Sequence, residues 1–247
     1  GYNNDDPYAP AYPCWMWRHF ILSIPVYDII FAYRKVNIED FKRAGGRRVG
    51  LLRSWYVPER NHSLELTAQD KAEFESDVVF VGHYENDGRL EMLEAVVTAG
   101  YRLRIFGPGY DWDPVLKQSR ILRNHAPVKL VWSENYNKAL CGGKIALCFL
   151  SKLNRDTYTR RCFEIPATKT MMLAEYTADL ATLFSEGVEA EYFRSTDELL
   201  DKIKRYLDND NKRQAVALAG FNRLIEEGHD VVSRMQQVMK QVTAIRS

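Results

Sequence analysis

The sequence predicts an α/β protein built on a doubly wound parallel sheet. Short apolar runs recur along the chain and alternate with segments of helical periodicity. The runs are nearly continuous rather than alternating, as in strands that are buried on both faces. Glycine-containing or polar segments follow several of them, and ligands of such sheets bind at the carboxyl ends of the strands.

The composition sets limits on domain number and partners. A chain of 247 residues with 46% hydrophobic residues can form one large domain or two small ones. The 34 basic and 33 acidic residues nearly cancel, so no nucleic acid partner is expected. The longest apolar stretches fall short of the ~20 residues that span a bilayer, so we expect no membrane span.

The cysteines indicate reduced thiols. The sequence contains four, without a C-x-x-C pair, at Cys14, Cys141, Cys148 and Cys162. This pattern favours a cytoplasmic protein over a disulfide-linked or zinc-binding one. We therefore expect neither a metal nor a cofactor.

The amino-terminal region contains a parallel strand–helix–strand unit. Apolar strands are predicted at 27–32 and 48–52, with a short helix at 36–44 between them. Residues 1–25 have no clear secondary structure, and the segment 2–7 (Y-N-N-D-D-P) has the composition of an Asx-rich turn. A polar linker is predicted at 56–75.

The second region contains the main sheet. Its predicted strands are 77–81, 101–106, 128–132, 145–150, 171–174 and a possible sixth at 190–193. Helical patterns follow the first strand up to Gly100 and the third strand from residue 134. After a capping-box start at Ser195, three further helices are predicted to complete the chain, and their methionines are expected in the core.

One stretch indicates a nucleotide site. Residues 161–167, R-C-F-E-I-P-A, lie between two predicted strands and combine Arg161, preceded by Arg160, with Glu164. Arginines and a helix N-terminus attract phosphate, whereas a carboxylate accepts hydrogen bonds from hydroxyls such as those of a ribose. Alternatively, Glu164 forms a simple ion pair with Arg160 or Arg161.

These residues carry a resemblance to a known family. The R-x-F-E-I-P-A motif, the following apolar strand and Glu175, and a later F-x-x-G resemble CgeB-like (spore maturation protein type) glycosyltransferases. The resemblance implies the GT-B fold, in which two Rossmann-like domains face a cleft, with a carboxyl-terminal domain of the glycosyl transferases group 1 type. It implies domains at 1–60 (partial, acceptor side) and 76–228 (donor-binding), with a terminal helix at 229–247 that packs back on the first domain.

The resemblance also assigns roles to single residues. It implies that Glu164 binds the donor's ribose, that Arg161 faces a phosphate or the donor sugar, and that Arg89 contacts the diphosphate. Gly82 closes the first strand of this domain and would let a diphosphate approach the backbone. Gly107 would shape the base pocket or simply turn the chain.

Three further positions carry expectations. Asp5 and Asp6 match the family's Y-x-N-D-D-P and are candidates for the base that deprotonates an acceptor hydroxyl, or for positioning at the cleft. Lys169 stands where many relatives have glycine, so it would either bind the donor's phosphates or block the pocket. Because the chain begins with Gly and lacks the strand expected before residue 2, we expect a truncated fragment.

The sequence thus predicts a metal-independent glycosyltransferase of the hexosyltransferase type. Its donor would be a nucleoside diphosphate sugar, and its acceptor an unidentified hydroxyl on a glycan, protein or small molecule. The alternative is a non-catalytic nucleotide-sugar-binding or interaction module of the same fold. An epimerase lacks an obvious residue pair, and an NAD enzyme lacks a G-x-G-x-x-G.

Overall fold

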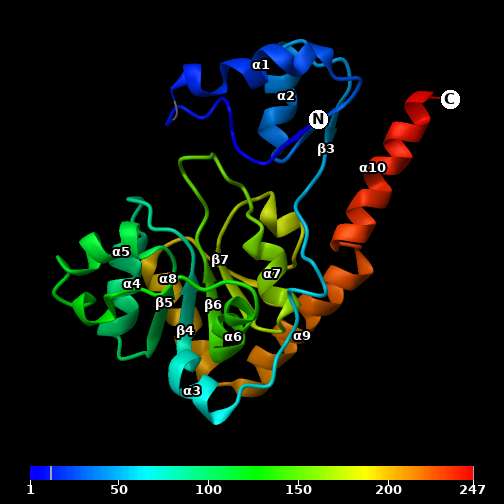
Figure 1. Ribbon diagram of the computed structural model, residues 1–247. Helices are drawn as coiled ribbons and strands as arrows, with labels where there is room; N and C mark the ends of the chain where they lie inside the picture. Colours follow the sequence, from blue (N-terminus) through cyan, green and yellow to red (C-terminus); the bar gives the residue numbers. More distant parts are fainter. Residues whose placement is uncertain (12, 247) are drawn as a thin grey trace.

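A computed structural model describes residues 1–11 and 13–246 and contains two parallel sheets (Figure 1). The small sheet has the order β1-β2-β3, and the large sheet has the order β5-β4-β6-β7-β8. The strands are β1 (Tyr2–Asn3), β2 (Ile30–Ala32), β3 (Val49–Leu51), β4 (Ser76–Val81), β5 (Leu103–Phe106), β6 (Gly143–Cys148), β7 (Met171–Glu175) and β8 (Glu191–Phe193). Every strand pair is parallel, which confirms the predicted fold class.

Helices cover both faces of the large sheet. Val78 and Phe80 of β4 pack in one core with α4 (Arg89–Thr98), α5 (Gly109–Leu116) and α8 (Thr196–Leu207). Val79 and Val81 point to the opposite core, with α6 (Glu134–Gly142) and α7 (Arg161–Ala167). This alternation, with a period of two residues, explains why the strands read as continuous apolar runs.

The remaining helices extend or connect these layers. In the small sheet, Ile30 and Ala32 of β2 pack against Phe41 of α2. The other helices are η1 (Cys14–Trp17), α1 (Arg18–Ser23), η2 (Ile24–Val26), α2 (Lys35–Arg43), α3 (Ala68–Phe74), η3 (Arg123–His125), η4 (Leu180–Thr182), α9 (Asp210–Glu226) and α10 (Val231–Arg246). None of the helices in the described part of the chain is both long and apolar enough to cross a membrane.

The structure corrects two predicted segments. Residues 128–132 form no strand, because only Lys129 bridges to Phe106 and the Val128 N–H donates to the Asp113 carboxylate at 2.8 Å instead. The predicted linker contains helix α3, which begins with a capping box between Thr67 and Asp70. Local side-chain hydrogen bonds stabilise the observed conformation of both segments.

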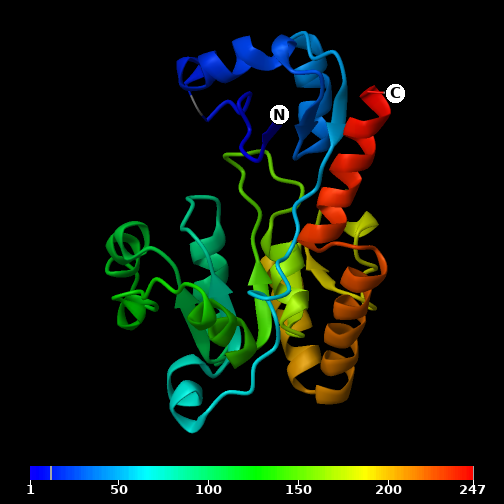
Figure 2. The ribbon, with the colours of Figure 1, turned by 45° about the vertical axis from the view of Figure 1, so that its right-hand side comes forward.

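The chain passes between the two sheets at two adjacent points. Tyr56, on the way to the large sheet, accepts a hydrogen bond from the N–H of Val231 at 3.0 Å and donates to the carbonyl of His229 at 3.2 Å. Helix α10 then runs beside β3, where Gln237 Nε2 donates to the Leu51 carbonyl at 3.4 Å (Figure 2).

A long loop joins the sheets on the other side. Residues 149–160, between β6 and α7, reach up to the small sheet (Figure 1). Tyr158 of this loop stacks on Tyr33 with ring centroids 4.6 Å apart, and its hydroxyl donates to the Tyr33 carbonyl at 2.8 Å. The loop therefore forms one wall of the space between the sheets.

Candidate functional site: two adjoining pockets

Two pockets adjoin at the carboxyl ends of the strands. The first, which we call the large-sheet pocket, has a volume of about 420 Å³ and lies where the segments after β4 and β5 meet the start of α7. The second, the cleft pocket, has a volume of about 240 Å³ and lies between the small sheet and the β6–α7 loop. Thr159 and Arg160 line both pockets.

The large-sheet pocket lies at a topological switch point. From β4 the chain goes to β5 on one side, and β6 then takes the place on the other side of β4. The connections after β4 and β6 therefore diverge, which leaves a crevice for ligands. Gly82, Gly107, Arg161 and Glu164 all line this pocket, so the structure brings together four of the six positions predicted to bind the donor.

Close packing beside the pocket explains both glycines. A Cβ atom at Gly107 would lie 2.1 Å from the Gly82 carbonyl oxygen, which accepts a hydrogen bond from Trp112 Nε1 at 2.8 Å. At Gly82, a Cβ atom would lie 2.6 Å from Nη1 of Arg161. Both glycines therefore make room, one for a neighbouring backbone and the other for a guanidinium.

Arg161 retains unused hydrogen-bonding capacity. Its Nη2 donates a long hydrogen bond of 3.5 Å to the Phe149 carbonyl, and its Nε is buried without a partner in the described part of the chain. A buried donor without an acceptor is uncommon in folded proteins. An anion in the pocket could satisfy this guanidinium.

Glu164 is held in place by a tyrosine. Tyr136 of α6 donates its hydroxyl hydrogen to Oε2 of Glu164 at 2.7 Å, and burial, together with the Glu164 charge, raises the pKa of Tyr136 well above its ordinary value. The expected ion pair with Arg160 is present, with Nε 3.3 Å from Oε1. The carboxylate side chain keeps 15% of its surface exposed toward the pocket and can accept further hydrogen bonds there.

The structure places the other two predicted donor contacts elsewhere. Arg89 is 2% exposed, and its guanidinium is paired with Asp87 at 2.6 Å and bonded to the His83 carbonyl at 2.6 Å. It shapes the turn after β4 and, contrary to expectation, does not line the pocket. Its neighbour His83 is largely exposed and pairs with Asp111.

Lys169 also departs from expectation. It precedes β7, at the amino ends of the strands, and its Nζ lies 4.7 Å from the centroid of the Phe221 ring. Because parallel strands share one orientation, this edge is opposite the large-sheet pocket. Lys169 therefore neither binds a ligand in that pocket nor blocks it.

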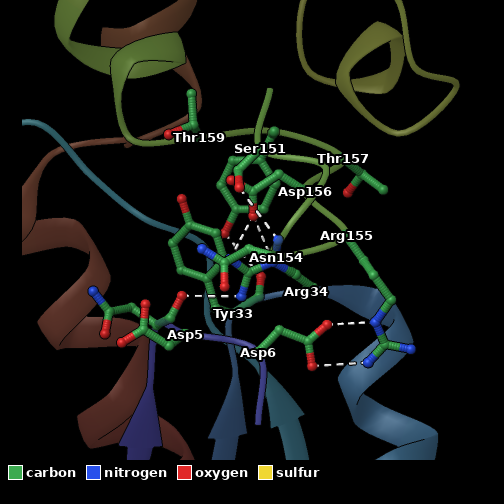
Figure 3. Close-up of polar contacts among 12 residues, drawn as sticks. Asp5, Asp6, Tyr33, Arg34, Ser151, Asn154, Arg155, Asp156, Thr157 and Thr159 are labelled. Carbon is green, nitrogen blue, oxygen red and sulfur yellow. Dashed lines mark hydrogen bonds and ion pairs between the residues drawn. The ribbon is translucent and has the colours of Figure 1, made fainter. Parts of the chain in front are cut away.

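The cleft pocket depends on charged contacts between the sheets (Figure 3). Arg155 of the loop donates to Asp6 at 2.8 Å and to Asp40 at 2.9 Å, and Arg34 of the small-sheet region pairs with Asp156. Arg155 has a φ of 48°, a conformation that costs an L-residue of order 1–3 kcal/mol unless its surroundings enforce it. The ion pairs provide that enforcement.

The two predicted acidic residues differ in their surroundings. Asp6 is fully buried, and although burial opposes ionisation, hydrogen bonds from Arg155, Asn37 and the Tyr8 N–H lower its pKa. A carboxylate bound in this way is a poor base, so its contacts with Arg155 and Asn37 favour the positioning role over the role of a base. Asp5 is exposed and lines the cleft pocket, so it remains available.

The structure adds an acidic residue that the sequence analysis overlooked. Asp156 lines the cleft pocket, and burial raises its pKa from 3.8 to about 6 despite the opposing charge of Arg34. Its carboxylate therefore gains and loses its proton close to neutral pH. The sequence signal for Asp156 is its position in a loop at the carboxyl end of a buried strand. Parallel sheets place functional residues at such positions.

The fold is that of known GT-B glycosyltransferases. HepE (Alr3699) from Anabaena, solved in complex with UDP-glucose, matches with a TM-score of 0.75 and 14% identity over 98% of this chain and 71% of that chain. TarM from S. aureus, solved as a point mutant with Fondaparinux, alpha-GlcNAc-glycerol and UDP, matches with a TM-score of 0.68 and 13% identity over 99% and 49% of the two chains. Sucrose-phosphate synthase from Thermosynechococcus elongatus matches with a TM-score of 0.67 and 12% identity over 94% of this chain and 62% of that chain.

The sequence itself assigns the family. A family model described as glycosyl transferase-like matches residues 89–240, which is more than half of the chain. The protein therefore belongs to the glycosyl transferase-like family. A search of curated proteins gives no match.

Proposed function

We propose that the protein transfers a sugar from a nucleoside diphosphate sugar to an acceptor hydroxyl. The observation that carries the proposal is the pairing, in one pocket, of an unsatisfied arginine with an anchored carboxylate. Arg161 would bind the diphosphate and Glu164 the ribose hydroxyls. Gly82 would give the diphosphate access to the backbone, and Gly107 would position the turn beside the nucleobase.

The sugar would point from the large-sheet pocket toward the cleft pocket. Arg160 lines both and lies 5.8 Å from the centroid of the Trp55 ring, so it forms their common boundary. At the acceptor side, Asp156 and Asp5 are the carboxylates available to take a proton from the attacking hydroxyl. The growing charge of the leaving diphosphate would be stabilised by Arg161 without a metal.

Other parts of the proposal follow the resemblance. We infer a CgeB-like enzyme of the hexosyltransferase type that acts in the cytoplasm without a cofactor. Its domains would be 1–60, 76–228 and 229–247, as the sequence predicts. The contacts of α10 with β3 agree with a terminal helix that returns to the first domain.

A non-catalytic module remains the second candidate. The observation in its favour is that Asp6, one of the two acidic residues predicted at the cleft, is already engaged by Arg155. A module of this kind would bind the donor and release it unchanged. Hydrolysis or transfer of the sugar would exclude this candidate.

Thermal-shift titration tests the donor site. UDP, GDP, dTDP and their sugars are added to the parent chain, to Glu164→Ala and to a control, Glu134→Ala, whose side chain is 69% exposed and outside the pocket. We expect one diphosphate to raise the melting temperature of the parent and the control but not that of Glu164→Ala. If no nucleotide stabilises the parent, or if Glu164→Ala responds like the control, the proposed site is wrong.

A further inference from the structure

Two cysteines face each other beneath the large-sheet pocket. Cys148 ends β6, Cys162 lies in the first turn of α7, and their Sγ atoms are 3.7 Å apart. Both side chains are fully buried in the core below the pocket. The proposed sugar transfer uses neither of them.

The surroundings favour ionisation of one thiol. Arg161, which precedes Cys162, places a positive charge close to Cys148. The thiol of Cys162 can donate a hydrogen bond to the Cys148 sulfur, and the Thr159 N–H donates to the Cys162 sulfur at 3.5 Å. A nearby cation and a second thiol within reach are two features of reactive dithiols; the third, solvent access, is limited here to small reagents because both sulfurs are buried.

We propose that Cys148 and Cys162 form an oxidative modification site that a small peroxide converts into an internal disulfide. The Cys148 thiolate attacks one oxygen of hydrogen peroxide, the O–O bond breaks, and hydroxide leaves as a sulfenic acid forms. The Cys162 thiol then attacks the sulfenic sulfur, the S–S bond forms, and the hydroxyl group leaves as water with the thiol proton. The two thiols are oxidised, and the peroxide is reduced to water.

The geometry requires only a limited movement. A disulfide has an S–S distance of about 2.05 Å, so the two sulfur atoms must approach each other by roughly 1.7 Å. One sulfur belongs to a strand end and the other to a short helix that follows a long loop, so the helix start can supply this movement. Because both thiols are buried behind Arg161, the reagent must be as small as peroxide.

Cys141 provides an internal control. Its sulfur contacts only backbone groups, the Leu64 N–H at 3.4 Å and the Thr168 carbonyl at 3.9 Å. Cys148 and Cys162, the other cysteines whose side chains the structure describes, form no hydrogen bond with it. Oxidation at Cys141 would therefore stop at a single-cysteine product.

The experiment maps disulfides after peroxide treatment of the full chain. The parent is compared with Cys14→Ser/Cys141→Ser, which keeps only the pair, and with the same variant carrying Cys162→Ser in addition. After alkylation and digestion, we expect a peptide that links Cys148 to Cys162, two hydrogen atoms lighter than the two reduced peptides together and reversed by dithiothreitol. The triple variant should give no linked peptide.

Two results would overturn the proposal. In one, both thiols of the folded parent remain fully alkylatable after peroxide treatment and subsequent unfolding. In the other, Cys148 pairs with Cys14 or Cys141 as often as with Cys162, as an unfolded chain would. Because the linked peptide is read in the parent itself, the test does not depend on the folding of the serine variants.

Discussion

The large-sheet pocket rests on backbone packing within one sheet, whereas the cleft pocket rests on charged side chains that join two sheets. In the first, Gly82 and Gly107 bring two backbone segments together, and α6 and α7 supply the polar groups. In the second, Arg155 and Arg34 hold the loop against the small sheet. We infer that the large-sheet pocket is a preformed binding site. The cleft pocket, the proposed reaction site, exists only while the two sheets stay together.

The largest expected effect is at Arg155. Arg155→Met leaves the buried Asp6 without its cation, and the cost in unfolding free energy lies below the about 3–5 kcal/mol of fully buried pairs, because Arg155 is 32% exposed and Asp6 keeps its bond from Asn37. We expect transfer to be lost while nucleotide affinity, measured by calorimetry, stays near that of the parent. Arg43→Met is the control, because Arg43 also pairs with Asp40 but is 76% exposed. An equal loss of nucleotide affinity would contradict the separation of the two pockets.

Gly107→Ala should break the large-sheet pocket. The new methyl group would overlap the Gly82 carbonyl, and overpacking of this kind costs about 1–3 kcal/mol of unfolding free energy. Nucleotide binding should be lost with it. Gly100→Ala introduces a methyl group into open space at a φ of 89°, so it should cost some stability but spare binding. Retained binding in Gly107→Ala would refute the required close approach.

Arg161→Lys should sharpen the assignment of the diphosphate. Lysine keeps the charge but loses the planar fork of donors, and hydrogen bonds to charged groups contribute about 1.5–3 kcal/mol. The nucleoside diphosphate should therefore lose affinity, whereas the corresponding nucleoside should not. Arg102→Lys is the matched control, because Arg102 is 59% exposed and lies outside both pockets. Equal losses for nucleoside and diphosphate would place the phosphates elsewhere.

The pH dependence should separate the pockets. Asp156 has a pKa raised to about 6, so its ionised form increases as the pH rises toward 6 and is nearly complete well above it. If Asp156 is the base, kcat/KM, which reports ionisation of the free enzyme, rises about tenfold per pH unit below that value and then levels off. Asp156→Asn should abolish this limb and leave nucleotide binding unaffected. A transfer rate that depends on pH in the same way after this substitution would exclude Asp156.

Asp156 also makes the free energy of unfolding depend on pH, and its raised pKa fixes the direction of that dependence. Its pKa is higher in the folded chain than in the unfolded chain, so the folded state holds the proton more tightly between pH 3.8 and about 6. Unfolding free energy should therefore decrease as the pH rises through this window, and Asp156→Asn should remove that contribution. Denaturant titrations of both proteins across the window measure the difference.

Tyr136→Phe should have the smallest effect. It removes one hydrogen bond to Glu164, and a bond of this kind contributes about 0.5–1.5 kcal/mol. Nucleotide affinity should fall slightly, because Glu164 keeps its charge but loses its anchor. Calorimetry compares Tyr136→Phe with Tyr101→Phe, whose tyrosine precedes β5 at the edge of the sheet opposite the pocket. A loss as large as that of Glu164→Ala would mean that Tyr136 itself contacts the ligand.

The sequence predicts the sheet far better than it predicts the cleft. Buried parallel strands leave a continuous apolar signal that a single chain displays, so β4, β6 and β7 are found within a few residues. The segment 128–132 shows the limit, because its apolar composition serves the pocket wall instead of a strand.

The candidate site also has residues that the sequence predicts and residues that it does not. Glu164 and Arg161 lie on one short helix, and their spacing is visible in the sequence. Arg89 and Asp6 could not be assigned because their partners determine their roles: Asp87 holds the first, and Arg155, 149 residues away, holds the second. Asp156 acquires its raised pKa only from burial between two sheets, which no local pattern records.

The paired crossings at Tyr56 and Val231 define how the molecule can move. Both connections between the sheets pass through one place, and backbone hydrogen bonds join them there. These bonds favour an opening of the cleft by rotation about this point, because sliding would break them. The ion pairs of the β6–α7 loop lie on the other side of the cleft and hold it closed. A substrate that separates these ion pairs would let the two sheets rotate apart about the start of α10.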